Sequence, residues 1–238
     1  MTDDGHSADP DIRVVSTPEE LRHLVTLFNQ VWGSITPVVG VELLRAIGHG
    51  GGYVAAAYHG EQVVGGSLAF LARHSGEPAL HSHVTGVLPG LRRTGLGRAL
   101  KLHQRAWAAE HGLAWVTWTF DPLVRRNARF NLHVLRAGVH AYLVDFYGPI
   151  DDSINHRDES DRLLVAWPTV GDLAAPEEEP AAGTIIVATP DDIVVLRRTD
   201  PTEATAWRHR VRDELGGALG AGGHVVGFSR DGCYLVRT

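Results

Sequence analysis

The pattern of apolar and polar residues divides most of the chain into helices and strands of ordinary length. A helix start is predicted at Thr17, because Pro18 suits the first helical position and Glu20 completes a capping box with Thr17. Apolar residues then recur at helical spacing. Later runs of β-branched and apolar residues, bounded by turns with glycine and proline, predict strands. We expect strands at 12–15, 53–58, 63–71, 80–87, 113–119, 139–147 and 163–167, and helices that begin near residues 18, 37, 94 and 126.

A change of composition near residue 170 separates a second, smaller block from the first. The segment before this block is rich in proline, glutamate and alanine, which is typical of a linker. Beyond it we expect a strand at 185–187, a helix from Pro201 and a terminal hairpin of strands 225–228 and 233–236. The predicted organisation is a disordered leader at 1–10, a main domain at 11–168, a linker at 169–182 and an extension at 183–238.

The order of the predicted elements bounds the fold class. One strand, two helices, three strands, a helix, a strand, a helix and a strand follow each other in the main domain. Because strands and helices do not alternate strictly, this order predicts an α/β (α+β mixed) fold. We expect a central mixed β-sheet flanked by helices, with a small C-terminal α/β extension.

Composition and charge exclude several classes of function. The formal net charge is −6, so the surface as a whole is not built to hold nucleic acid. The single cysteine, Cys233, permits no internal disulfide. Residues Met1 to Pro10 lack the basic and apolar regions of a secretion signal, and no apolar run approaches the ~18 residues of a membrane span. The sequence therefore predicts a cytoplasmic protein that does not bind membranes.

The stretch from Val87 to Leu100 carries the strongest chemical signal. A predicted strand ends, a Pro-Gly turn follows, and a helix begins among glycines and arginines. The first amides of a helix lack internal partners and carry positive potential, and glycine lets an anion approach them closely. This combination predicts a phosphate or pyrophosphate site. Its residues are Arg92, Arg93, Thr94, Gly95, Leu96, Gly97 and Arg98.

Two other phosphate-binding motifs do not fit this stretch. A P-loop would carry Gly-Lys-Ser or Gly-Lys-Thr after its spacer, and neither is present. A dinucleotide fingerprint would need a third glycine three residues after Gly97, where this chain has Leu100. The remaining alternative is a glycine-rich turn into an amphipathic helix whose arginines only face solvent.

The spacing Arg92-x-x-Gly95-x-Gly97, between a strand ending in Val-x-Pro and an amphipathic helix, resembles the acyl-CoA pyrophosphate loop of the GNAT superfamily. The resemblance covers about residues 12–148, because the neighbouring predicted elements also fall where that fold has them. It implies an N-acyltransferase that uses acetyl-CoA or another acyl-CoA. The segment 117–123 and the tail around residue 207 resemble a branch of this superfamily with a long C-terminal extension.

The resemblance also implies contacts with coenzyme A beyond the loop. Backbone N–H groups around Gly86, Val87 and Leu88 would polarise the thioester carbonyl, and Asn127 would help to hold the CoA arm. The acceptor amine would lose a proton, attack the carbonyl directly and expel the CoA thiolate.

Three residues are candidates for the general base. His83 occupies the position at which many GNAT enzymes carry a glutamate, and an imidazole with a pKa near ~6.5 suits this task at neutral pH. His81 lies two residues earlier and so shares its face of the strand. Asp121, at the end of a buried strand, is the third. The alternatives are structural histidines, or zinc ligation by His-x-His, for which no further ligand lies nearby in sequence. We expect no metal.

The sequence leaves several candidates for the group that protonates the leaving thiolate. Where the family often has a tyrosine, this chain has Val134. The replacements closest in sequence are Tyr142 and Tyr147. Water is a third source, because a thiolate with a free pKa of about 8.5 is a reasonable leaving group.

The acceptor is predicted only by class. The resemblance favours transfer of an acetyl or succinyl group to the amine of a small molecule, including an amino acid. Acetylation of protein amines and a non-catalytic acyl-CoA sensor are the alternatives. The arginines at 208, 210 and 212 would either bind a substrate carboxylate or form a solvated basic helix face, and the extension could form a homodimer.

Overall fold

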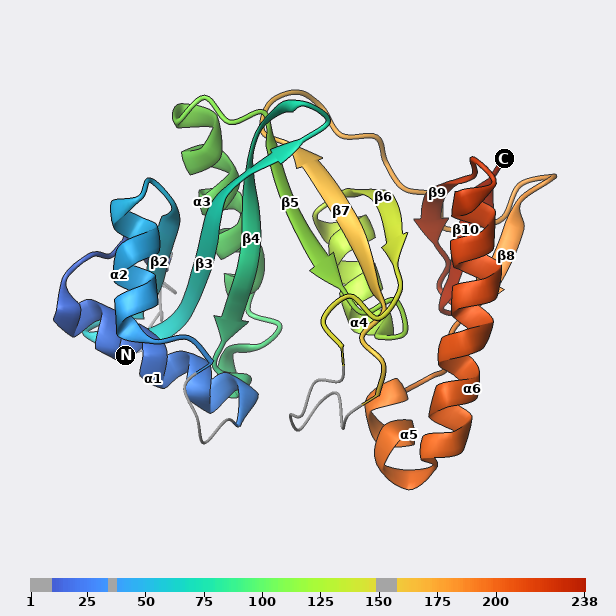
Figure 1. Ribbon diagram of the computed structural model, residues 1–238, viewed down its shortest axis with the longest axis horizontal. Coiled ribbons are helices and arrows are strands. Elements are labelled where there is room, and N and C mark those ends of the chain that lie inside the picture. Colours follow the sequence, from blue (N-terminus) through green and yellow to red (C-terminus); the bar gives the residue numbers. More distant parts are fainter. Residues whose placement is uncertain (1–9, 34–37, 149–157) are drawn as a thin grey trace, which may run out of the picture. The chain divides into compact units, whose positions relative to one another are not determined.

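The computed structural model describes residues 10–33, 38–148 and 158–238 (Figure 1). The predicted leader therefore lies almost entirely outside the described residues. The chain forms two compact units, which are described separately below. The first unit combines 1–71 with 82–107, and the second combines 72–81 with 108–238.

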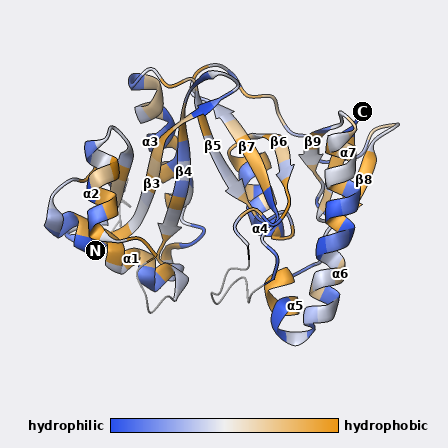
Figure 2. Cartoon of the chain, in the orientation of Figure 1, coloured by the Kyte–Doolittle hydropathy of each residue, from blue (hydrophilic) through white to orange (hydrophobic). Residues whose placement is uncertain are grey.

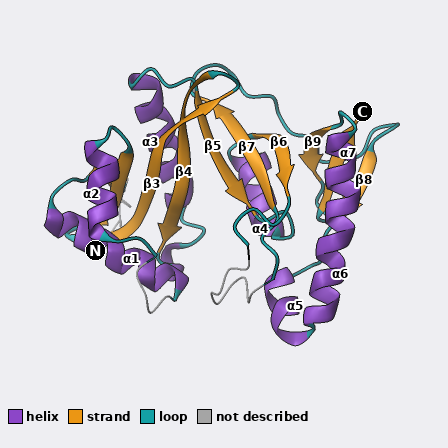
Figure 3. Cartoon of the chain, viewed as in Figure 1, coloured by secondary structure: helices purple, strands orange, loops and turns teal. Residues whose placement is uncertain are grey.

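A seven-stranded mixed sheet confirms the predicted fold class (Figure 3). Its strand order is β1-β2-β3-β4-β5-β7-β6. Pairing of β4 with β5 is parallel, whereas the pairs β1–β2, β2–β3, β5–β7 and β6–β7 are antiparallel. The strands are β1 Asp11–Val14, β2 Tyr53–His59, β3 Gln62–His74, β4 Glu77–Val87, β5 Trp115–Phe120, β6 Gly138–Leu143 and β7 Arg162–Pro168.

The helices of the first unit are those that the sequence pattern indicates, although the second begins at Val41 and not near residue 37. Helix α1 (Pro18–Trp32) has the predicted capping box, in which Thr17 accepts the amide of Glu20 and the Glu20 carboxylate accepts the amide of Thr17. The other helices are α2 (Val41–His49) and α3 (Leu96–Glu110).

Neighbouring strand residues divide the first unit's core between two faces of the sheet. Ala56 of β2 packs in a cluster with Leu24 and Phe28 of α1. The next residue, Ala57, packs instead with Leu96 and Leu100 of α3. Because adjacent side chains of a strand point to opposite faces, α1 and α3 cover opposite faces of this part of the sheet.

Between residues 125 and 145, the second unit departs from the sequence prediction twice. Helix α4 (Arg125–Arg129) continues as a π-helical turn to Val134, where the amide of Leu135 donates to the carbonyl of Phe130. Strand β6 ends at Leu143 and not at 147 as expected. Asp145 has a φ of 44°, a conformation that cannot continue a strand, and its amide donates to Asp161.

The C-terminal extension forms a three-stranded antiparallel sheet of order β8-β10-β9 and a run of helices. The predicted terminal hairpin is confirmed as β9 and β10. Helix α5 was not predicted, because its first three residues are β-branched and therefore strand-like in pattern. The elements are β8 Ile185–Ala188, α5 Ile193–Thr199, α6 Pro201–Val211, a π-helical turn Arg212–Gly216, α7 Gly217–Gly220, β9 His224–Phe228 and β10 Cys233–Arg237.

The extension makes specific contacts within the second unit. The Tyr234 hydroxyl donates to the carbonyl of Pro122 at 2.8 Å. Glu177, inside the predicted linker, forms a β-bridge with Gly227, and its carboxylate pairs with Arg237. The division into a main domain, a linker and an extension stays a prediction.

Candidate functional site

The loop before α3 has the tight glycine turn that the sequence predicts for an anion site. Residues Pro89–Leu91 form a 3₁₀ turn. Just after it, the Thr94 hydroxyl donates to the carbonyl of Leu91 (2.8 Å). Gly95 has a φ of 90°, which glycine adopts without strain, and its carbonyl accepts the amide of Ala99. The amides of the first helical turn therefore follow directly after a tight glycine turn.

Charge around this loop has the sign that a phosphate needs. Arg92, Arg93 and Arg98 are exposed, and Arg93 has a φ of 75°. The sequence-predicted loop residues therefore do lie together at the start of α3. Their binding of a pyrophosphate stays a prediction.

The hydrogen bonds at the end of β4 exclude one of the three backbone amides that were candidates for polarising a thioester carbonyl. The amide of Leu88 donates to the carbonyl of Val64 on β3 at 3.0 Å, so it is already used. In a regular strand consecutive N–H groups point to opposite edges. The amide of Val87 therefore points to the edge away from β3. The register of β4 with β5 runs from Ala79 to His81.

Gly86 is required for a reason that the sequence did not reveal. A Cβ at this position would lie 2.8 Å from the indole of Trp32 on α1. The absent side chain makes room for this tryptophan. Its packing against β4 fixes the end of the strand relative to α1.

His83 and His81 have different surroundings. The His83 ring is exposed and lies 5.9 Å from the ring of Phe70, measured between centroids. Partial burial lowers the pKa of His83 below its usual value, so the ring is neutral and able to accept a proton at pH 7. His81 is half-buried, and its Nδ1 lies 3.0 Å from the Thr117 hydroxyl. His83 thus presents the more accessible imidazole.

Asp121 is held in ion pairs, which disfavours it as a base. Arg197 donates to its carboxylate at 2.5 Å, and Arg208 donates to both of its oxygens at 2.9 and 3.1 Å. Burial alone would raise the pKa of Asp121, but the charge and hydrogen bonds of Arg208 outweigh it and hold the pKa well below its usual value. A carboxylate so stabilised is a weak proton acceptor.

The two candidate tyrosines also differ. The Tyr142 hydroxyl donates to Asp161 at 2.7 Å, and burial together with this bond raises the pKa of Tyr142 well above its usual value. Tyr147 is 43% exposed, and its hydroxyl lies 3.1 Å from that of Thr119. Tyr147 is therefore the more available proton donor. Asn127 lies half-buried in the first turn of α4, and its role toward coenzyme A stays a prediction.

The arginines of the extension contact carboxylates of this same unit. Arg208 is fully buried, and Arg212 donates to Asp161 and to Glu159. Arg210 stacks over Trp207, with its guanidinium carbon 4.7 Å from the ring centroid. These pairings leave Arg208 and Arg212 poorly placed to bind a substrate carboxylate.

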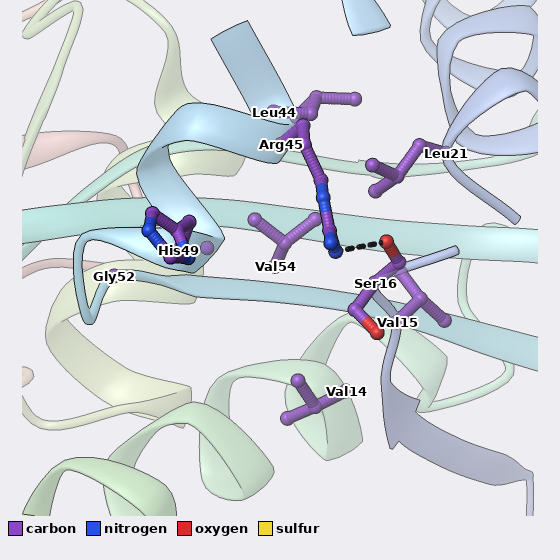
Figure 4. A pocket seen from close by; sticks show the side chains of 10 residues that line it. Val14, Val15, Ser16, Leu21, Leu44, Arg45, His49, Gly52 and Val54 are labelled. Atoms are coloured by element: carbon purple, nitrogen blue, oxygen red, sulfur yellow. Dashed lines mark hydrogen bonds between the residues drawn. The ribbon is translucent and has the colours of Figure 1, made fainter. Parts of the chain in front are cut away.

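A separate hollow of about 100 Å³ lies against α2, β1 and β2 in the first unit (Figure 4). Val15, Leu21, Leu44 and Val54 are among its apolar lining residues. Arg45 is also in its lining and donates to the carbonyl of Ser16 (2.6 Å). None of the sequence-predicted site residues lines it.

Sequence reasoning missed a buried lysine beneath β4, Lys101, together with its polar partners. The available signal was compositional, since Lys101 is the only lysine in the chain.

Among the described residues no cluster of three histidine, cysteine or acidic side chains could hold a metal ion. Within the same residues, no helix combines the length and apolar character of a membrane crossing.

A mixed sheet whose fourth strand leads through a loop rich in glycine and arginine into a helix is the arrangement that the resemblance to GNAT acyltransferases implies. Residues 21–130 match the family model described as the acetyltransferase (GNAT) family. Residues 21–130 therefore form a GNAT acetyltransferase segment, and acetyl-CoA is the co-substrate that this family implies. Among curated proteins none matches the sequence.

Solved structures support the fold. The protein yncA from Salmonella typhimurium, solved with acetyl-CoA, is 16% identical, with a TM-score of 0.55 over 70% of this chain and 98% of that one. Arabidopsis thaliana NAA60 with a bisubstrate analogue is 16% identical, with a TM-score of 0.54 over 67% and 97%. The ribosomal-protein-S18-alanine N-acetyltransferase of Escherichia coli is 14% identical, with a TM-score of 0.53 over 68% and 96%. At these identities the likeness concerns the fold alone.

Proposed function

We propose that this GNAT acetyltransferase moves the acetyl group of acetyl-CoA onto the amine of a small molecule, with His83 as the general base. The observation that carries the proposal is the exposed, neutral imidazole of His83 on β4, on the strand that leads into the anion-binding loop. In this proposal residues 92–98 hold the CoA pyrophosphate.

The chemistry follows from these positions. His83 takes a proton from the acceptor ammonium, and the free amine attacks the thioester carbonyl. The amide of Val87, which points away from β3, donates to the oxygen that becomes negative. The C–N bond forms first, and the C–S bond then breaks and releases the CoA thiolate. The second proton of the attacking nitrogen passes to solvent water, and water protonates the thiolate. His83 returns its proton to solvent.

Calorimetric titration with acetyl-CoA and succinyl-CoA tests the donor. We expect acetyl-CoA to bind, and Gly97→Trp to abolish binding because an indole would fill the space beside the first helical amides. Thr26→Val is the control, since this exposed side chain lies on α1 and bonds only the carbonyl of Arg22. Unchanged affinity in Gly97→Trp would remove the pyrophosphate assignment.

A panel of acceptors with thiol detection tests the reaction. It includes amino acids, spermidine, an aminoglycoside and a peptide with a free N-terminus and a lysine. We expect CoA release with a small amine. Release with the peptide alone would make the protein an acetylase of proteins, and tight acetyl-CoA binding without release would make it a sensor.

A further inference from the structure

Lys101 is the only lysine among 22 basic residues, and the other 21 are arginines. It lies on α3 and is 4% exposed. Arginine has a larger, planar head group and keeps its charge under all ordinary conditions. A buried position that alone carries lysine, in a chain that otherwise uses arginine, therefore indicates a local requirement for a compact amine.

Lys101 belongs to a closed network of five side chains, called here the Lys101 network. Its Nζ donates to Ser82 Oγ and to Gln104 Oε1, both at 3.0 Å. Gln104 Nε2 donates to Ser67 Oγ at 3.0 Å, and Ser67 Oγ lies 2.9 Å from Thr85 Oγ1. The Thr85 and Ser82 hydroxyls lie 3.5 Å apart, which closes the ring.

The network shows that β4 is irregular between residues 82 and 85. Ser82 contacts Lys101 of α3, and Thr85 contacts Ser67, which is itself bonded to Gln104 of α3. Both hydroxyls therefore face α3. In a regular strand residues three apart point to opposite faces, so the alternation is broken between them, as in a β-bulge. His83 lies inside this irregular segment.

His83 is held from two sides by its neighbours. The preceding residue, Ser82, is anchored to α3 through Lys101, and the His83 ring packs against Phe70 of β3. Because an irregular segment lacks part of the ladder that would fix its peptide planes, side-chain bonds take over that task. Loss of the bond to Ser82 would let the 82–83 peptide, and with it the imidazole, turn.

We propose that Lys101 is a positioning residue for acetyl transfer, which fixes the His83 imidazole through its hydrogen bond to Ser82. This inference rests on the proposed function of His83 as the base. The partners named here, Ser82 and Gln104, are neutral, so the bonds depend on N–H donors and not on charge. A neutral amine still has two N–H groups, which suffice for these two acceptors.

Lys101 can be observed directly, because a lysine labelled with ¹³C at Cε gives one side-chain resonance from this chain. Burial lowers the pKa of Lys101 to about 7. We expect its resonance to titrate far below the usual lysine range in the wild type and in His83→Gln. This spectrum verifies that the network is intact in each protein that retains Lys101.

The decisive experiment compares Lys101→Met, His83→Gln and the double variant, with acetyl-CoA and the fastest amine of the panel. We expect kcat to fall about 100-fold in His83→Gln and about 10-fold in Lys101→Met. The double variant should match His83→Gln within about 3-fold, since a displaced base cannot matter once the base is gone. Affinity for acetyl-CoA should stay within about twofold throughout.

Tyr53→Phe is the matched control for general loosening of α3. It removes a hydrogen bond between β2 and His103 of α3 (2.8 Å) without touching β4, and its kcat should stay at the wild-type value. Ser82→Ala deletes the same bond as Lys101→Met from the other side. It should show the same loss of kcat, and it tests the inference if Lys101→Met does not fold.

Each result has a distinct meaning. A full kcat in Lys101→Met and Ser82→Ala, with a low kcat in His83→Gln, overturns the role of Lys101 alone. Losses that multiply in the double variant also overturn it, because Lys101 would then act independently of His83. A full kcat in His83→Gln overturns the base assignment and this inference together. A panel without any acetylated amine overturns the proposed function itself.

Discussion

Each compact unit buries one set of charged side chains, and the two sets follow opposite rules. In the first unit, Lys101 Nζ donates to the hydroxyl of Ser82 and to the side-chain amide of Gln104. In the second unit, arginines meet aspartates in direct ion pairs. We call this set the arginine–aspartate cluster, formed by Asp121, Asp158, Asp161, Arg197, Arg208 and Arg212.

The two sets differ in whether the basic side chain keeps its positive charge at neutral pH. Arg208 is fully buried, and burial alone would lower its pKa, but Asp121 and Asp158 outweigh that and raise the pKa well above its usual value. Burial lowers the pKa of Lys101 to about 7, so this side chain exchanges its proton near neutral pH. The cluster joins α5 and α6 to the end of β5, and Figure 2 shows the hydrophilic residues that α6 carries. The Lys101 network orients a short segment of one strand.

The largest expected effect comes from breaking the arginine–aspartate cluster. Asp121→Asn keeps the shape but removes the charge that offsets Arg197 and Arg208. We expect the free energy of unfolding to fall by about 3–5 kcal/mol, because a buried arginine loses its partner. Urea denaturation measures this. Asp191→Asn is the control, since its side chain is 94% exposed beside Arg125, and it should cost less than about 1 kcal/mol.

The same variant tests Asp121 as a base. Turnover per folded molecule, measured well below the unfolding transition, should stay close to the wild-type value. A hundred-fold loss of turnover in folded protein would restore Asp121 as a candidate. A stability loss no larger than that of Asp191→Asn would contradict the cluster's role in holding the extension.

A smaller effect is expected from the Lys101 network, and its sign depends on pH. The pKa of Lys101 is about 7 in the folded protein and about 10.4 in an unfolded chain. Between these values the unfolded chain binds one proton more, so the stability of the wild type rises with pH. Relative to Lys101→Met, the free energy of unfolding should increase by at most about 1.4 kcal/mol per pH unit from pH 7 to 10.

Urea denaturation of both proteins at several pH values measures this slope. Below pH 7 both states of the wild type are charged, so the difference between the proteins should be constant. A difference independent of pH from 7 to 10 would show that Lys101 stays protonated. The Lys101 network would then follow the same rule as the arginine–aspartate cluster.

Local signals in the sequence predicted most of the fold. The capping box at Thr17 and the apolar runs of β2 and β3 depend on neighbours along the chain, and these elements occur where expected. The end of β6 was wrong because a contact between Asp145 and Asp161, sixteen residues apart, sets it. The π-helical turn after α4 also contains a contact that local sequence does not indicate, because the buried Asn131 accepts a hydrogen bond from Trp118, thirteen residues away.

In the candidate site, too, contiguous residues could be predicted from the sequence, whereas contacts between distant residues could not. The loop at 92–98 could be predicted because its glycines and arginines are contiguous. The surroundings of Asp121 could not, because Arg197 and Arg208 lie 76 and 87 residues away. Gly86 was singled out, but its contact with Trp32 depends on the packing of α1. Residue types can suggest chemistry, whereas burial and partners decide which of them is free to perform it.

The smallest effects should distinguish the two tyrosines at the edge of the cluster. Tyr142→Phe removes one hydrogen bond to Asp161, which still accepts bonds from Arg212, so we expect a loss of about 1–2 kcal/mol in the free energy of unfolding. Tyr147→Phe should change it by less than about 0.5 kcal/mol, because the side chain is exposed. If water protonates the thiolate, both variants keep wild-type turnover. A tenfold slower CoA release in Tyr147→Phe, with unchanged stability and unchanged affinity for acetyl-CoA, would instead assign the proton to Tyr147.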